Sequence, residues 1–131
     1  MSLKITGNNK SIDSQKEVEL IVNSYENAPT FLKTIGARKK SFQETKREIW
    51  EIEGVKLMID IWPFLEPILE IEGKNENEVK KVAKKLGLNW QNAVFNSIDF
   101  IHSQKYKIPT EKINNHTPLI KFNMKNPFVN H

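Results

Sequence analysis

Lys56-Leu57-Met58-Ile59-Asp60-Ile61 alternates polar and apolar residues, and Ile68-Leu69-Glu70-Ile71-Glu72-Gly73 repeats the alternation after a turn at 62–67. Because successive side chains of a strand point to opposite faces, the pattern predicts two antiparallel strands with one core face and one polar face. The core face is expected to hold Leu57, Ile59, Ile61, Leu69 and Ile71. The other face is expected to hold Lys56, Met58, Asp60, Glu70 and Glu72.

Acidic residues gather on the predicted polar face. Two carboxylates spaced two apart on a strand lie about 7 Å from each other along the chain, close enough to share a cation or a bound water. Hard oxygen ligands of this kind suit Mg²⁺ or Mn²⁺ better than zinc. Glu70, Glu72 and Asp60 are therefore candidate metal ligands. The alternative, and the more common one for such spacing alone, is an ordinary solvated face of an antiparallel sheet.

Composition sets the class of protein. A chain of 131 residues suffices for one domain, and a net charge of +4 favours anionic ligands without choosing among them. With no cysteine, neither disulfides nor thiolate metal sites can form. No run of 18 apolar residues and no secretion signal is found, so a cytoplasmic protein without a membrane partner is expected. Met1-Ser2-Leu3 could be a vector remnant.

The rest of the chain alternates strand and helix signals. Strands are expected over 3–6 and 15–22, joined by a turn over 7–11 into a hairpin in which Glu17 and Glu19 would share a face. A further strand is expected over 39–52, where Arg47, Ile49 and Glu51 would share a face, and a Glu53-Gly54 turn would join it to the next two strands in a meander. Helices are expected over 25–35, 75–86 and 91–106. The second begins with a capping box from Asn75 to Glu78, and the third is expected to bury Val94 and Phe95 and to be ended by Pro109. A short strand over 119–122 and a frayed tail over 123–131 complete the series.

Four lysines, Lys80, Lys81, Lys84 and Lys85, mark the polar side of the predicted 75–86 helix. Such a face usually solvates a helix, although it could bind nucleic acid. A nucleic-acid partner is therefore the least expected one.

An ordered set of short motifs resembles the C-terminal part of a CYTH domain, the family of class IV adenylate cyclases, thiamine triphosphatases and inorganic triphosphatases. The motifs cover nearly the whole chain: Lys46-Arg47-Glu48-Ile49-Trp50, Gly54-Val55, Ile59-Asp60-Ile61-Trp62-Pro63, Leu69-Glu70-Ile71-Glu72-Gly73, Ala83-Lys84-Lys85-Leu86-Gly87-Leu88, Tyr106-Lys107-Ile108 and Leu119-Ile120-Lys121-Phe122.

The resemblance implies an α+β domain over 1–122 with an antiparallel β-barrel or tunnel and flanking helices, followed by the flexible tail 123–131. Its inner wall would bind a triphosphate-containing small molecule such as ATP, thiamine triphosphate or inorganic polyphosphate, together with Mg²⁺ or Mn²⁺. Arg47 matches a phosphate-contacting arginine, and Asp60, Glu70 and Glu72 match metal-binding acids. Glu17 and Glu19 resemble a further acidic pair. Lys56 joins the phosphate-binding group from alternation alone.

One departure limits the functional expectation. The family opens with a Glu-x-Glu-x-Lys strand, and Ile21 stands where Glu17-Val18-Glu19 would need its lysine. The chain could therefore be a fragment, one half of an assembly completed by a second copy or another chain, or a degenerate domain that only binds. The expected function is triphosphate binding related to hydrolases and cyclases, between which the sequence does not choose. The alternative is a non-catalytic nucleotide- or polyphosphate-binding module.

Overall fold

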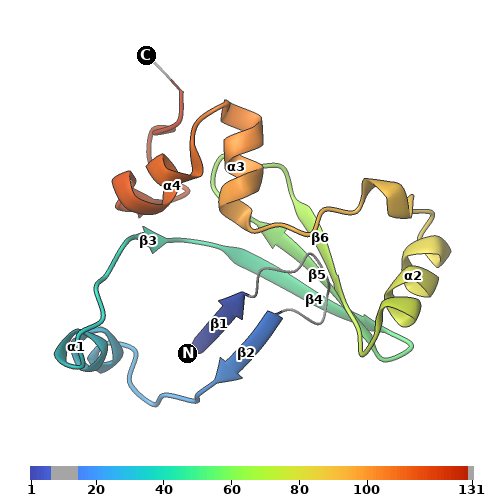
Figure 1. Ribbon diagram of the computed structural model, residues 1–131, viewed down its shortest axis with the longest axis horizontal. Helices are drawn as coiled ribbons and strands as arrows, with labels where there is room; N and C mark the ends of the chain where they lie inside the picture. The colour runs from blue at the N-terminus through green and yellow to red at the C-terminus, as the bar shows by residue number, and fades with distance from the viewer. Residues whose placement is uncertain (7–14, 130–131) are drawn as a thin grey trace. The chain divides into compact units, whose positions relative to one another are not determined.

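The computed structural model describes residues 1–6 and 15–129, which divide into two compact units, Met1–Lys40 and Ser41–His131. Each unit is described by itself. The described residues form a mixed α and β structure in which the strands pair mainly antiparallel and four α-helices are present (Figure 1).

The first unit holds a hairpin and one helix. Strand β1 (Ser2–Thr6) pairs antiparallel with β2 (Gln15–Glu19), with Leu3 opposite Val18, which confirms the predicted pairing. Helix α1 (Asn27–Thr34) follows and has no buried residue. The turn predicted between the two strands lies outside the described residues.

The second unit is built on a three-stranded meander. Strands β4 (Lys46–Ile52), β5 (Val55–Ile61) and β6 (Ile68–Glu72) lie in the order β4-β5-β6, and both pairings are antiparallel, as predicted. Glu53 and Gly54 form the turn between β4 and β5 with φ of +53° and +77°. Two positive φ values are the signature of a type I′ turn, whose twist matches that of a hairpin.

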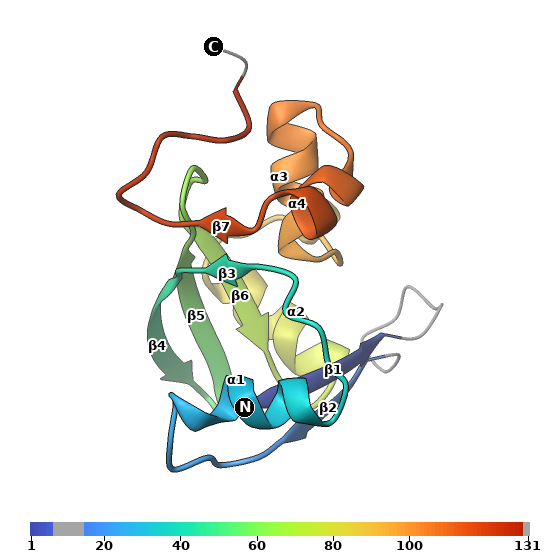
Figure 2. The same cartoon turned by 90° about the vertical axis from the view of Figure 1, so that its left-hand side faces the viewer.

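Helix α2 (Glu76–Lys85) covers one face of this sheet, contacting β5 and β6 (Figure 2). The predicted cap is confirmed, because the Asn75 side chain accepts a hydrogen bond from the Glu78 amide at 3.0 Å. The core beneath the helix consists of Val55, Leu57 and Val82, with Ile52 and Ile71 packed against it. Each such side chain contributes about 1.5–3 kcal/mol on burial.

The C-terminal part adds two helices and a small parallel sheet. Helix α3 (Ile98–Tyr106) packs on α4 (Thr110–His116), and β7 (Leu119–Ile120) pairs with β3 (Phe42–Gln43). A second core joins these elements. It consists of Ile113, Ile120 and Phe128, with Phe64, Tyr106 and Ile108 packed against them.

Four expectations are corrected. The described strands form three small sheets and no closed barrel, since only three strands associate in the largest sheet. The single strand over 39–52 is two strands, because Phe42 and Glu44 donate their amides to Pro118 and Ile120 and so turn β3 toward β7.

The other two corrections concern the C-terminal third. The helix over 91–106 is the short 3-10 turn η2 (Trp90–Asn92) followed by α3, and Val94 and Phe95, which were expected in the core, are exposed between them. The segment expected as a frayed tail places Phe128 in the second core, where it is 4% exposed.

Candidate functional site

The register of the meander brings the predicted phosphate- and metal-binding residues onto one face of the sheet, opposite the face covered by α2. Arg47 lies opposite Asp60, and Lys56 lies between Glu51 and Glu72. Glu70 lies opposite Met58, and this pair lies between the Arg47–Asp60 pair and the Lys56–Glu72 pair along the sheet. The alternation read from the sequence therefore places Arg47, Lys56, Asp60, Glu70 and Glu72 together, as expected.

Arg47 is the centre of this face because its guanidinium contacts two of the acids. Its Nε and Nη2 donate to the two oxygens of Asp60, each at 2.6 Å, and Nη2 also donates to Oε2 of Glu70 at 2.8 Å. The hydrogen bonds with Asp60 raise the pKa of Arg47 above its ordinary value, and the nearby charges of Glu70 and Glu72 add to the effect. Two parallel bonds to one carboxylate also fix the plane of the guanidinium.

The two acids that contact Arg47 differ in burial. Asp60 is 5% exposed and lies near Met58, which is 4% exposed, whereas Glu70 is exposed to solvent. A buried charge needs a partner of opposite charge. The two hydrogen bonds with Asp60 therefore hold the guanidinium of Arg47 on its buried side. Glu70 forms the outer contact of the same guanidinium, where solvent competes.

A divalent ion does not fit this arrangement of side chains. Arg47 fills the space between Asp60 and Glu70, and both Asp60 oxygens already accept hydrogen bonds from it. Over residues 1–6 and 15–129, no group of three acidic, histidine or cysteine side chains lies close enough to hold a metal. Mg²⁺ needs several oxygen ligands around it, and the positive guanidinium bound between these two acids repels such an ion.

The face carries an excess of negative charge. Two cations, Arg47 and Lys56, stand among four acids, Glu51, Asp60, Glu70 and Glu72. A free polyanion meets repulsion from the acids that are not paired with a cation. Alternation had already grouped Glu51 with Arg47 and Ile49, and the strand register now adds it to this face beside Lys56.

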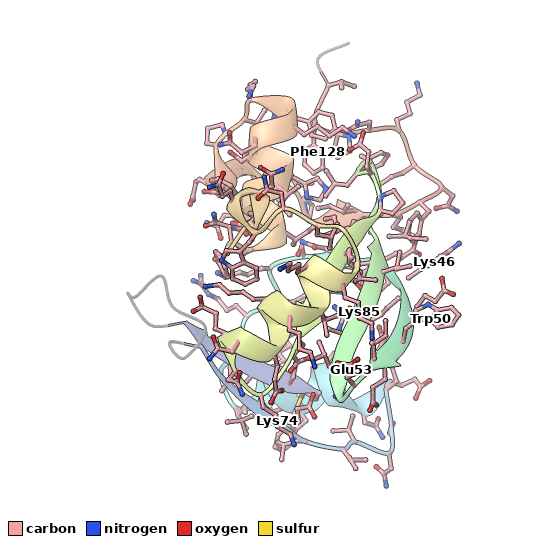
Figure 3. All side chains as sticks on the ribbon, turned by 90° about the vertical axis from the view of Figure 1, so that its right-hand side faces the viewer. Lys46, Trp50, Glu53, Lys74, Lys85 and Phe128 are labelled. Carbon is pink, nitrogen blue, oxygen red and sulfur yellow. The ribbon has the colours of Figure 1, made fainter. Side chains whose placement is uncertain are left out.

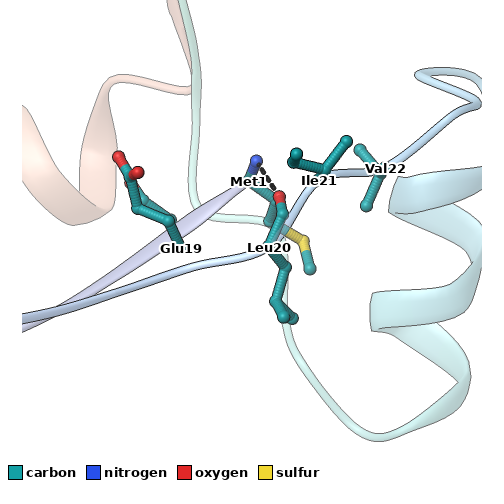
Figure 4. Close-up of a pocket in the computed structure, with 6 residues that line it drawn as sticks. Met1, Glu19, Leu20, Ile21 and Val22 are labelled. Atoms are coloured by element: carbon teal, nitrogen blue, oxygen red, sulfur yellow. Dashed lines mark hydrogen bonds between the residues drawn. The ribbon is translucent and has the colours of Figure 1, made fainter.

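Glu17 and Glu19, the further predicted acids, belong to the first unit. The side chain of Glu17 lies outside the described side chains. Glu19 borders a hollow lined by Met1, Ser2, Leu20, Ile21 and Val22, where the Met1 nitrogen donates to the Leu20 carbonyl at 2.8 Å (Figure 4). Glu19 is the only ionisable side chain among these lining residues, and the only cation among them is the ammonium group of Met1.

The lysine face of α2 is largely paired with acids. Lys81 and Lys85 both donate to the carboxylate of Glu53, at 2.9 and 2.6 Å (Figure 3 labels Glu53 and Lys85). The hydrogen bond from Lys85, followed by that from Lys81, lowers the pKa of Glu53 to about 2. Lys80 pairs with Glu76 and lies over the ring of Trp90. Sequence inspection had not connected the turn residue Glu53 with this helix.

No helix in the described part of the chain is long and apolar enough to cross a membrane. Comparison with protein-family models, with curated proteins and with solved structures found no match.

Proposed function

We propose that the chain is a non-catalytic module, related to CYTH domains, that binds a triphosphate-bearing small molecule through Arg47 and Lys56. One observation carries the proposal: Asp60 holds the Arg47 guanidinium at two points on a face that also presents Lys56. A fixed guanidinium loses little conformational freedom when it binds a phosphate, and its planar fork matches phosphate oxygens.

Binding at this face requires an exchange of partners. A phosphate oxygen takes the place of Glu70 at Nη2 of Arg47, while the buried Asp60 remains bound. A second phosphate reaches Lys56, further along the sheet and opposite Glu72. Glu70 and Glu72 are therefore competitors of the ligand for the two cations.

This competition favours binding over catalysis as the function. The acids that the CYTH resemblance assigns to a metal are either held by Arg47 or lie beside a lysine, so the proposal includes no resident ion. Binding of Mg²⁺ or Mn²⁺ stays a prediction. In this proposal the ion arrives bound to the triphosphate. Hydrolase or cyclase activity remains the second candidate, on the strength of the resemblance alone.

Calorimetry with tripolyphosphate, ATP and thiamine triphosphate, each in EDTA and again with Mg²⁺ or Mn²⁺, tests the proposal. We expect Lys56→Gln to weaken binding about 3- to 10-fold in EDTA, as the loss of one partly screened charge contact predicts. Lys84→Gln, a lysine on α2 away from this face, is the matched control and should leave the affinity unchanged. Equal effects of the two substitutions would mean that only net charge matters.

Glu70→Gln separates the two roles of this residue. If Glu70 competes for Arg47, its neutralisation strengthens binding in EDTA by about 3- to 10-fold. If Glu70 instead holds a metal, the same substitution weakens binding, and only when Mg²⁺ or Mn²⁺ is present. Product formation in the metal-containing samples would establish an enzyme, and absence of heat with all three ligands would remove the binding proposal.

A further inference from the structure

Strand β4 forms an outer edge of the meander, and its outward side has no backbone partner among the described residues. It pairs with β5 alone, and no other backbone hydrogen bond in the described part of the chain reaches 46–52. The strand is regular over all seven residues, without proline, glycine or bulge. Such an edge is a template for another strand.

The turn geometry identifies the backbone groups that point outward. In a two-residue hairpin the residues flanking the turn, here Ile52 and Val55, exchange hydrogen bonds, and every second pair beyond them does the same. Trp50 and Glu48 therefore bond to β5. The N–H and C=O groups of Arg47, Ile49 and Glu51 point away from the sheet.

Two large apolar side chains stand exposed on this edge. Ile49 is 64% exposed on the Arg47 face, and Trp50 is 58% exposed on the α2 face, because α2 covers β5 and β6 and leaves β4 open. Figure 3 labels Trp50 and Lys46 at the outer margin of the sheet, away from α2. Solvent exposure of both faces of one strand is unfavourable for apolar residues of this size.

We propose that β4 pairs with β4 of a second copy of this chain, antiparallel about a two-fold axis through Ile49. This inference is independent of the proposed ligand. It joins two meanders into one six-stranded sheet with both α2 helices on the same face, since a two-fold axis perpendicular to the sheet keeps the faces together.

The charges of β4 select this register over its neighbours. With Ile49 opposite Ile49, Arg47 lies opposite Glu51 of the second copy, and the reverse pair forms by symmetry. A register centred on Glu48 places two glutamates opposite each other, and one centred on Trp50 pairs no opposite charges. In the chosen register the two Trp50 residues are diagonal neighbours about 7–8 Å apart on the paired strands, within the reach of aromatic side chains. The contacts of Arg47 with Asp60 and Glu70 use Nε and Nη2, which leaves Nη1 as the nitrogen that would meet Glu51 of the second copy.

Sedimentation and light scattering of the full chain test the dimer directly. We expect a mass of twice 15.3 kDa at high protein concentration, with dissociation on dilution through the micromolar range, as befits a small interface. Ile49→Lys and Ile49→Glu place like charges on the two-fold axis, so each variant alone should be monomeric. Their mixture should recover the dimer, because lysine then faces glutamate. Leu69→Lys, on the opposite edge strand β6, should leave the dimer intact.

Cross-linking fixes the register, and the chain's lack of cysteine makes it unambiguous. Residues opposite each other in a hydrogen-bonded pair have Cα atoms about 5.5 Å apart, which suits a disulfide. The Ile49→Cys variant should therefore cross-link under mild oxidation. The Glu51→Cys variant should not, because position 51 is on the same face but displaced by four residues from position 51 of the second copy.

Three outcomes would each overturn the proposal. The first is a wild-type chain that is monomeric at high concentration, and the second is a dimer that Ile49→Lys leaves intact. The third is cross-linking of the Glu51→Cys variant in place of the Ile49→Cys variant, which would assign a different register to the pair.

Discussion

The Arg47 guanidinium shows how one side chain can be both a structural partner and a binding group. It meets a buried carboxylate on one side and an exposed carboxylate on the other. Loss of a partner from a buried charge leaves that charge without compensation, whereas solvent replaces a lost partner at the surface. The inner contact with Asp60 therefore contributes mainly to stability, and the outer contact with Glu70 is the one available for exchange.

A pair of nearly isosteric substitutions tests this difference. Asp60→Asn removes the charge that accepts both bonds from Arg47, and we expect it to lower the free energy of unfolding by about 1–2 kcal/mol. Glu70→Gln should lower it by less than about 0.5 kcal/mol, because both groups of that pair are exposed. Urea unfolding followed by circular dichroism measures both values. Equal losses would show that the burial of Asp60 does not matter.

At the scale of single residues, the sequence predicted which side chains share a face of the sheet, but not which of them contact each other. Period-two alternation correctly grouped Asp60 with Glu70, and the register of β4 on β5 adds Arg47 to the same face. Alternation could not predict that the arginine would pair with the acids and fill the space between them, since that depends on lateral register and side-chain rotamers. Nor could it predict the burial of Asp60, which depends on tertiary packing.

At the scale of elements, the ion pairs of Glu53 link the β4–β5 turn to the last two turns of α2. The pKa of Glu53 is lowered from 4.5 to about 2 by hydrogen bonds from Lys85 and Lys81. A carboxyl group whose pKa is lower in the folded state stabilises the fold above its unfolded pKa. This contribution is lost as the pH falls through the folded value.

Glu53→Gln should therefore unfold a few degrees below the wild-type chain at pH 7, with the difference shrinking below pH 4.5 and vanishing near pH 2. Thermal melts of the two proteins at several pH values measure this difference. Salt at about 1 M should also reduce it at pH 7, because the three groups are exposed and screened. A difference in melting temperature that changes with neither acid nor salt would mean that the substitution acts through the turn backbone and not through the ion pairs.

The elements that the sequence predicted well carry strong local signals. Helix α2 has a side-chain cap, acids in its first turn and lysines in its last, so local physics alone sets its ends. The apolar residues over 94–101 have helical spacing, so the sequence predicted one continuous helix and missed the break before α3. Ser97 at the helix start, with Asp99 in the first turn, was the available signal for that break. Pro109 was interpreted only as a helix end, although it also precedes α4.

At the scale of the whole molecule, the second unit depends on residues far apart in the sequence. Phe128 packs against Phe64 with ring centroids 6.2 Å apart and against Tyr106 at 5.4 Å. The buried His102, whose ring nitrogens lie 3.1 and 3.2 Å from the Ile98 and Pro63 carbonyls, is 5.0 Å from the same ring. Local pattern gave no sign of these contacts, because the short segment around Phe128 has neither a helical nor a strand-like period of apolar residues.

Removal of the Phe128 ring tests whether the C-terminal segment is part of this fold. Phe128→Ala should lower the free energy of unfolding by about 3 kcal/mol, since a cavity opens among Phe64, Tyr106 and Ile120. Val129→Ala, at the exposed neighbouring position, should change it by less than about 0.5 kcal/mol. Denaturant titrations of the full chain measure both, and amide exchange in α3 and α4 locates the loss. A frayed segment would leave both substitutions without effect, whereas a strong effect of Phe128→Ala alone means that the last described residues close the second core.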